Sequence, residues 1–155
     1  MATLHYGNLL DAPEKYICHQ VNLQGVMGSG VAKYVKEKYP HIFKSYYGVC
    51  ANYNNKDLLG SVLFAQTQDG TDKTICNMFS QNEYGYDGAL YTSYDAFRNC
   101  LEHIKGYCPK GSSIAFPWKI ACVRGGADWG IIKPMIEEVL VDYDIHYYCL
   151  NQWEA

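Results

Sequence analysis

Residues that can handle a polar ligand lie close together near the N-terminus. His19 and Asn22 end an apolar run and precede three glycines within six residues, Gly25, Gly28 and Gly30. An amphipathic, lysine-rich pattern follows at once. A glycine loop that leads into a helix exposes backbone N–H groups, and the helix N-terminus adds partial positive charge. The pattern predicts a site for a small anion, and the alternative is a tight turn that simply needs glycine.

The loop departs from three standard templates. It has the glycine spacing of a Walker A loop, but Val31 stands where Lys is required. The third glycine of a dinucleotide fingerprint is replaced by Lys33. A nucleophile elbow needs a glycine two residues before its serine, and Met27 precedes Ser29 there. Neither Mg-NTP hydrolysis nor a serine nucleophile is therefore indicated.

A second glycine loop, "IACVRGGADW", occupies residues 120–129. It leads from an apolar run through Gly125 and Gly126 into a helical pattern that starts near Asp128. In open α/β sheets, ligands bind at the carboxyl ends of neighbouring strands. The two loops are therefore expected to form two lips of one crevice, which would suit an elongated ligand with a diphosphate in its middle.

Three side chains are candidates for chemistry in such a crevice. His19 could act as a general acid or base or orient a water, and the alternative is a histidine packed at a strand end. Gln81, at the end of another strand, could position water or a ribose, or be an ordinary polar residue leaving a sheet. Asp87 could be the acidic partner of His19, although a solvated turn residue is the commoner role.

Hydrophobic patterns indicate the elements that carry these residues. Strands are predicted over residues 3–6, 15–21, 60–67, 74–81, 112–118 and 144–151, with a hairpin turn over 68–73. Helices are predicted over residues 30–50, 91–108 and 128–140. Alternating strands and helices indicate an α/β sandwich with a largely buried, mixed sheet.

The helix boundaries carry their own signals. Pro40 predicts a break within the first helical stretch. Thr92 or Ser93 could cap the second helix, and Asp128 is a good N-cap for the third. Pro134 lies inside the third pattern, so that helix either begins late or carries a kink.

The composition narrows the class of protein. The chain has 155 residues and a formal net charge of −3, which fits one domain over residues 1–155 and argues against a platform for extended nucleic acid. Seven cysteines without a CxxC pair indicate reduced, buried thiols of a cytoplasmic protein. No apolar run is long enough for a membrane helix, and the N-terminus lacks a signal-peptide pattern. The histidines lie apart without metal-ligand spacing, so neither a metal nor another cofactor is expected.

Three segments resemble macrodomains, and within them the phage and bacterial branch that processes ADP-ribose 1''-phosphate, related to the yeast enzyme of that name. They are residues 7–40, "GNLLDAPEKYICHQVNLQGVMGSGVAKYVKEKYP", residues 75–97, "ICNMFSQNEYGYDGALYTSYDAF", and residues 116–140, "FPWKIACVRGGADWGIIKPMIEEVL". The resemblance implies a single three-layer α/β/α domain with a mixed central sheet. It also implies that the ligand is ADP-ribose or ADP-ribose 1''-phosphate.

The resemblance assigns ligand contacts by position. Asn22 would hydrogen-bond the distal ribose. The first loop and the start of its helix would surround that ribose and one phosphate through Gly25, Val26, Met27, Gly28, Ser29, Gly30 and Val31. The second loop would hold the diphosphate through Cys122, Val123, Arg124, Gly125 and Gly126, where Arg124 could pair with phosphate or point into solvent.

Two departures from the family pattern affect these assignments. Asn8, followed by Leu9, stands where many macrodomains carry the Asp that receives the adenine amino group, and its uncharged carbonyl oxygen should accept more weakly. The lysine of the hydrolases that remove ADP-ribose is absent, because Ser80 and Gln81 occupy that stretch, and their partner Asp is replaced around Gly125.

The function expected from this resemblance is binding of ADP-ribose or a derivative, with hydrolysis of the 1''-phosphate of ADP-ribose 1''-phosphate. His19 and a positioned water would assist that reaction. The alternatives are a non-catalytic ADP-ribose-binding module and a hydrolase that removes ADP-ribose from a modified target.

Overall fold

The central sheet organises the whole chain, of which the computed structural model describes residues 2–154. Its six strands are β1 (Thr3–Tyr6), β2 (Tyr16–Val21), β3 (Val62–Gln66), β4 (Thr74–Phe79), β5 (Ser113–Pro117) and β6 (Asp144–Cys149). They lie in the order β1-β6-β5-β2-β4-β3. All neighbours run parallel except β3, which is antiparallel to β4. The mixed sheet predicted from the sequence is confirmed.

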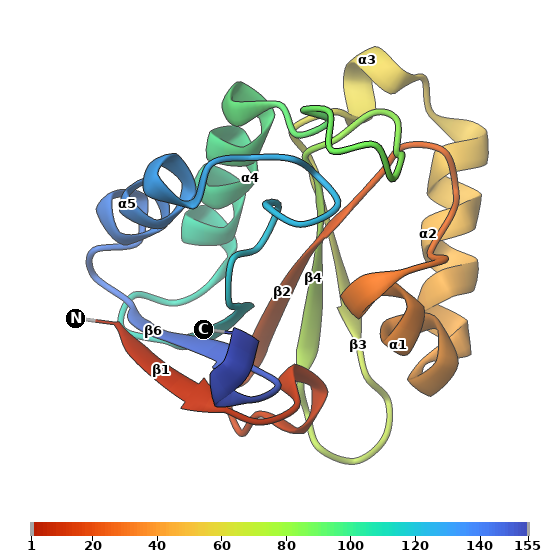
Figure 1. Cartoon of the computed structure of the whole chain (residues 1–155). Coiled ribbons are helices and arrows are strands. Elements are labelled where there is room, and N and C mark those ends of the chain that lie inside the picture. The colour runs from red at the N-terminus through yellow and green to blue at the C-terminus, as the bar shows by residue number, and fades with distance from the viewer. Residues whose placement is uncertain (1, 155) are drawn as a thin grey trace.

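Helices cover both faces of this sheet (Figure 1). Between the strands lie α1 (Gly30–Lys38), α2 (Pro40–Asn52), α3 (Asn55–Leu58), α4 (Tyr94–Tyr107) and α5 (Trp129–Val139), with short 3₁₀ turns η1 (Leu9–Asp11) and η2 (Gln152–Glu154). The pairs α1–α2 and α4–α5 pack on opposite faces, and each forms its own apolar cluster with the sheet. The predicted three-layer α/β/α architecture is therefore confirmed.

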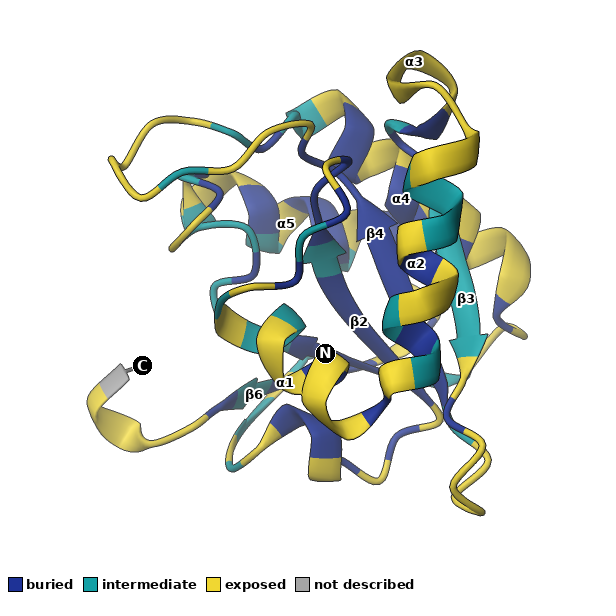
Figure 2. Ribbon diagram, turned by 90° about the vertical axis from the view of Figure 1, so that its right-hand side faces the viewer, coloured by how far each residue is buried: buried dark blue, intermediate teal, exposed yellow. Residues whose placement is uncertain are grey.

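The central strands are buried on both faces, as Figure 2 shows for β2 and β4. Along β2, Cys18 packs in the cluster under α4 and α5, whereas Ile17 and Val21 pack in the cluster under α1 and α2. This alternation follows from the two-residue period of a strand. Polar side chains at such positions, including His19, are consequently enclosed by protein rather than by solvent.

The helix starts follow local capping chemistry. Pro40 is the first residue of α2, where its missing N–H costs no helical hydrogen bond, so the predicted break is confirmed. Ser93, and not Thr92, caps α4, because its hydroxyl accepts a bond from the Ala96 N–H. Asp128 caps α5, which starts at Trp129 and runs through Pro134, so that helix does not begin late.

Other sequence expectations concern thiols and membrane spans. All seven cysteines are free, five of them are buried, and Cys50 and Cys122 are half-buried. Among the described residues, no helix is both long and apolar enough to span a bilayer.

Candidate functional site

A cavity of about 560 Å³ lies at the carboxyl ends of the neighbouring strands β2 and β5. The rest of its wall comes from residues 7–10, 28–32, 84–86 and 119–124 without Cys122, from Tyr148 and Leu150 at the end of β6, and from Val26, Tyr34 and Gln81. Both glycine-rich loops therefore border one cavity, as the pattern of two strand-to-helix loops predicts. Its volume falls in the range of roughly 300–1,000 Å³ that is typical of small-molecule sites.

The first loop presents a run of free backbone donors. Residues 28–32 all border the cavity, and their N–H groups donate no hydrogen bond within the described part of the chain. Ser29 is the N-cap of α1 but makes no side-chain capping bond, and the first backbone donor in this stretch is Lys33. The uncapped start of a nine-residue helix thus faces the cavity, where the helix dipole favours an anion.

The second loop combines free donors with close packing. The N–H groups of residues 123–126 also donate no hydrogen bond among residues 2–154. Val123 and Arg124 border the cavity, but Gly125 and Gly126 do not. A Cβ on Gly125 would lie 2.2 Å from Thr92 Oγ1, and one on Gly126 would lie 2.2 Å from the Ala89 carbonyl oxygen. These two glycines are required because the 84–92 loop packs directly on them.

The cavity is electropositive although the chain is acidic overall. The only charged side chains among its bordering residues are Lys119 and Arg124, and none is a carboxylate. The Arg124 guanidinium lies 4.5 Å from the centre of the Tyr86 ring, and both residues border the cavity. A cavity with two cations and two runs of free N–H groups is suited to an anionic ligand.

Sequence reasoning missed Lys119, which lies directly before the second glycine loop. Lys119 and Ala121 have φ values of +60° and +69°, in the left-handed region that costs non-glycine residues energy. Both border the cavity. Strained backbone of this kind concentrates at functional sites, but neither residue type signals it in a sequence.

His19 is buried and borders the cavity. Its Nε2 lies 2.6 Å from Asn77 Oδ1, whereas its Nδ1 has no hydrogen-bond partner in the described structure. Burial lowers the pKa of the imidazole to about 4, because desolvation disfavours the charged form. The ring is therefore neutral at pH 7 in the ligand-free protein, where its free nitrogen can act as a base or as a hydrogen-bond acceptor.

Gln81 borders the cavity, but both the oxygen and the nitrogen of its side-chain amide already make a hydrogen bond within the protein. Its Oε1 accepts a bond of 2.6 Å from Gln20 Nε2, and its Nε2 donates to the Glu83 carbonyl. Gln20 also bonds Ser80 and Thr92, and Thr92 donates to the Ala121 carbonyl. This buried network ties the loop after β4 to the loop after β5. Sequence reasoning missed Gln20, whose partners lie about 60 to 70 residues away.

Asn22 also borders the cavity, and it shapes the first loop from within. Its Oδ1 accepts bonds from the Gln24 N–H at 2.9 Å and the Tyr46 hydroxyl at 2.8 Å. Its Nδ2 donates to the Val26 carbonyl, which leaves one N–H for a ligand. The predicted ribose contact therefore depends on that one hydrogen.

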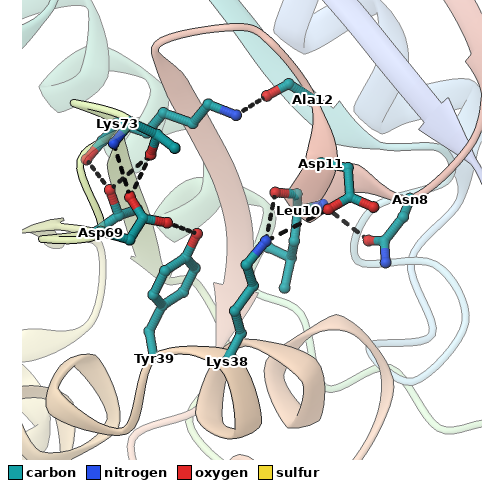
Figure 3. Close-up of polar contacts among 10 residues, drawn as sticks. Asn8, Leu10, Asp11, Ala12, Lys38, Tyr39, Asp69 and Lys73 are labelled. Carbon is teal, nitrogen blue, oxygen red and sulfur yellow. Dashed lines mark hydrogen bonds and ion pairs between the residues drawn. The ribbon is translucent and has the colours of Figure 1, made fainter.

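Asn8 lies at the end of the cavity formed by the β1–η1 turn. Figure 3 shows its carbonyl oxygen turned to the Leu10 N–H, at 2.9 Å, where it caps η1. Leu9 borders the cavity and is largely buried. Lys38 of α1 reaches the Leu10 carbonyl and Asp11, so the turn is fastened to the helix that carries the first loop. One lone pair of the predicted adenine acceptor is thus already in use.

Several predicted residues lie outside the cavity wall. Asp87 does not border it and does not contact His19. Its carboxylate accepts bonds from the Ala89 N–H and the Tyr91 hydroxyl, which lower its pKa, so it organises its own turn. The other predicted contacts that do not border the cavity are Gly25, Met27, Cys122, Gly125 and Gly126. Val26, Gly28, Ser29, Gly30, Val31, Val123 and Arg124 do border it.

Known proteins resemble this chain in sequence. No protein-family model matches it. It is 25% identical over 135 residues to the DNA ADP-ribosyl glycohydrolase of Thermus aquaticus, which spans 86% of this chain and 36% of that protein. It is 32% identical over 79 residues to the ADP-ribose 1''-phosphate phosphatase of Saccharomyces cerevisiae, which spans 49% of this chain and 44% of that protein. Each match thus covers less than half of the curated relative.

Solved structures resemble it over nearly its whole length. The macrodomain of Mycobacterium tuberculosis DarG superposes with a TM-score of 0.77 and 24% identity, over 96% of this chain and 97% of that one. Thermosipho africanus DarTG in complex with ADP-ribose superposes with a TM-score of 0.75 and 19% identity, over 95% of this chain and 41% of that one. The chain therefore has the macrodomain fold, as its sequence motifs predicted.

Proposed function

We propose that the chain binds ADP-ribose or a derivative in the cavity between its two glycine loops. The observation that carries the proposal is that free N–H groups of residues 28–32 and 123–124 border a cavity whose charged side chains are Lys119 and Arg124, with no carboxylate. A diphosphate is an acceptor-only group with delocalised negative charge. Backbone donors, a helix N-terminus and two side-chain cations are its natural partners.

The remaining wall suits the two nucleoside-like ends of such a ligand. Asn8 offers an amide beside the apolar Leu9, and Tyr148 and Leu150 lie at the same cavity. Asn22 and His19 offer one N–H and one ring nitrogen near the first loop. In this arrangement the diphosphate lies between the loops, and the sugars and base contact the side chains.

Isothermal titration calorimetry with ADP-ribose tests this proposal directly. We expect saturable binding to the wild type, with ribose 5-phosphate binding much more weakly because it lacks both the diphosphate and the base. The absence of heat and of competition at millimolar ADP-ribose would contradict the proposal.

We further propose that the substrate is ADP-ribose 1''-phosphate, from which the protein releases phosphate. The sequence match to the yeast phosphatase supports this assignment. His19 is neutral and has one unpaired ring nitrogen that accepts a single hydrogen bond, so its part in the reaction is to hold either the attacking water or a ribose hydroxyl of the substrate in place. Phosphate release by the wild type and by His19→Ala measures that part, and equal rates would remove His19 from the mechanism. Binding of ADP-ribose without any turnover would instead indicate a non-catalytic reader.

A second candidate function is removal of ADP-ribose from a modified target. The match to a DNA ADP-ribosyl glycohydrolase over 86% of this chain favours it. The absence of the lysine on which the family's hydrolases depend counts against this function. Ser80 lies in that stretch instead, where it is buried and donates a hydrogen bond to Gln20. Incubation of the purified protein with ADP-ribosylated DNA tests this second function. Release of ADP-ribose would support it, and an unchanged substrate would exclude it.

A further inference from the structure

The protonation form of His19 is fixed by Asn77, a residue on β4 whose Cα pairs with that of His19 in the register. The Asn77 side-chain nitrogen donates to the Leu63 carbonyl at 2.9 Å and the Ile75 carbonyl at 3.3 Å. Its Oδ1 is therefore the atom that faces His19 Nε2 at 2.6 Å. An amide oxygen only accepts hydrogen bonds, so Nε2 carries the ring proton and Nδ1 carries a lone pair.

The lone pair on Nδ1 is buried and unpaired within residues 2–154. The two nitrogens of an imidazole point to roughly opposite sides of the ring. β2 lies between β4 and β5, and Nε2 is turned to β4. Nδ1 therefore lies on the side of the ring away from β4, and His19 borders the cavity. A buried acceptor without a partner is costly, and a ligand that supplies a donor removes that cost.

We propose that His19 Nδ1 accepts a hydrogen bond from a free ribose hydroxyl of the bound nucleotide, and that Asn77 is the positioning residue that holds the ring in this tautomer. This inference rests on the proposed binding of ADP-ribose. It requires that the ligand carry an unsubstituted hydroxyl at one position of its ribose. A hydroxyl can donate to Nδ1, whereas the oxygen of a phosphoester, an acyl ester or a second glycosidic bond cannot. Ligands substituted at this one hydroxyl should therefore be excluded.

The tautomer is measured on the wild type, without any substitution, by long-range ¹H–¹⁵N correlation NMR of the histidine rings. We expect a protonated Nε2 and an unprotonated Nδ1 for His19 in the free protein, and a shift of the Nδ1 signal on saturation with ADP-ribose. A protonated Nδ1, or an Nδ1 signal unchanged at saturation, would overturn the inference. In Asn77→Leu, which has no acceptor, we expect the second tautomer to appear. A ring that stays in the original tautomer there would show that Asn77 does not position it.

The contact itself is measured with ADP-ribose and a set of analogues that each lack one ribose hydroxyl. We expect the wild type to bind one analogue about fivefold more weakly, as loss of one neutral hydrogen bond implies. His19→Phe should lose this discrimination, and His103→Phe, on the exposed side of α4, should keep it. Discrimination that survives in His19→Phe would refute the contact. A wild type that binds no ADP-ribose would refute the proposed function, while the tautomer of the free protein would still test the role of Asn77.

Discussion

Gly125 gives the sharpest test of how the second loop is built. In Gly125→Ala, the new methyl group would lie 2.2 Å from Thr92 Oγ1, 2.4 Å from the Ala121 carbonyl oxygen and 2.6 Å from Gln20 Nε2. Real Cβ contacts are not this short, and one of the three atoms belongs to the backbone. The substitution therefore has to displace the loop.

The expected cost has two parts. Overpacking of a well-packed site costs about 1–3 kcal/mol. The Gly125 carbonyl also accepts bonds from the N–H groups of Tyr91 and Thr92, at 2.9 and 3.0 Å, and each is worth about 0.5–1.5 kcal/mol. We expect the free energy of unfolding to fall by about 2–6 kcal/mol, a large part of the 5–15 kcal/mol typical of a domain.

Urea unfolding followed by tryptophan fluorescence measures this change, because Trp118 and Trp129 flank the loop. Gly48→Ala is the matched control. Gly48 lies in α2, and a methyl group on its Cα would have no neighbouring atom within 4 Å, so this substitution should stabilise the protein by about 0.5–1 kcal/mol. If the free energy of unfolding of Gly125→Ala lies within about 0.5 kcal/mol of the wild-type value, then the 84–92 loop does not pack closely on this glycine.

Three further predictions concern side chains of the cavity. Asn22→Ala should lower the free energy of unfolding by about 2–3 kcal/mol, because Gln24, Tyr46 and Val26 each lose a partner; a change below about 1 kcal/mol in urea unfolding would contradict this. The lowered pKa of His19, about 4 against an ordinary value of 6.5, means that the unfolded chain binds more protons between these values. Stability should therefore fall by about 3 kcal/mol as the pH drops from 6.5 to 4, and His19→Phe should remove this part of the pH dependence in urea unfolding; an unchanged profile would count against it. Arg124→Ala should weaken ADP-ribose binding about tenfold, with a smaller salt dependence, and calorimetry at two salt concentrations that finds equal affinities for both proteins would show that Arg124 does not face the ligand.

The elements were predictable because their signals are local. The strand and helix patterns repeat at intervals of two and of three to four residues, and Pro40 and Asp128 mark helix starts within their own neighbourhood. The choice between Thr92 and Ser93 as the N-cap of α4 depends on a contact that is distant in sequence. Thr92 is unavailable as a cap because it bonds the Ala121 carbonyl, 29 residues away.

The adjacent glycines Gly125 and Gly126 show a second limit of prediction from sequence. Two adjacent glycines are compatible with an anion-binding loop and with close packing, since both need a residue without a side chain. Gly125 and Gly126 are packed under the 84–92 loop, while the donors that border the cavity come from the residues just before them and from the first loop.

The sequence by itself determined the succession of the main strands and helices along the chain, the two glycine loops at strand ends and the class of fold. Each of these depends on residues that are close together in the chain. Only the tertiary structure decided which polar atoms are left free to meet a ligand. Asn8, Asn22 and Gln81 each use part of their hydrogen-bonding capacity inside the protein, whereas one nitrogen of His19 remains unpaired among the described residues. A hydrogen-bonding group is available only after its neighbours in space have been counted, and most of those neighbours are distant in sequence.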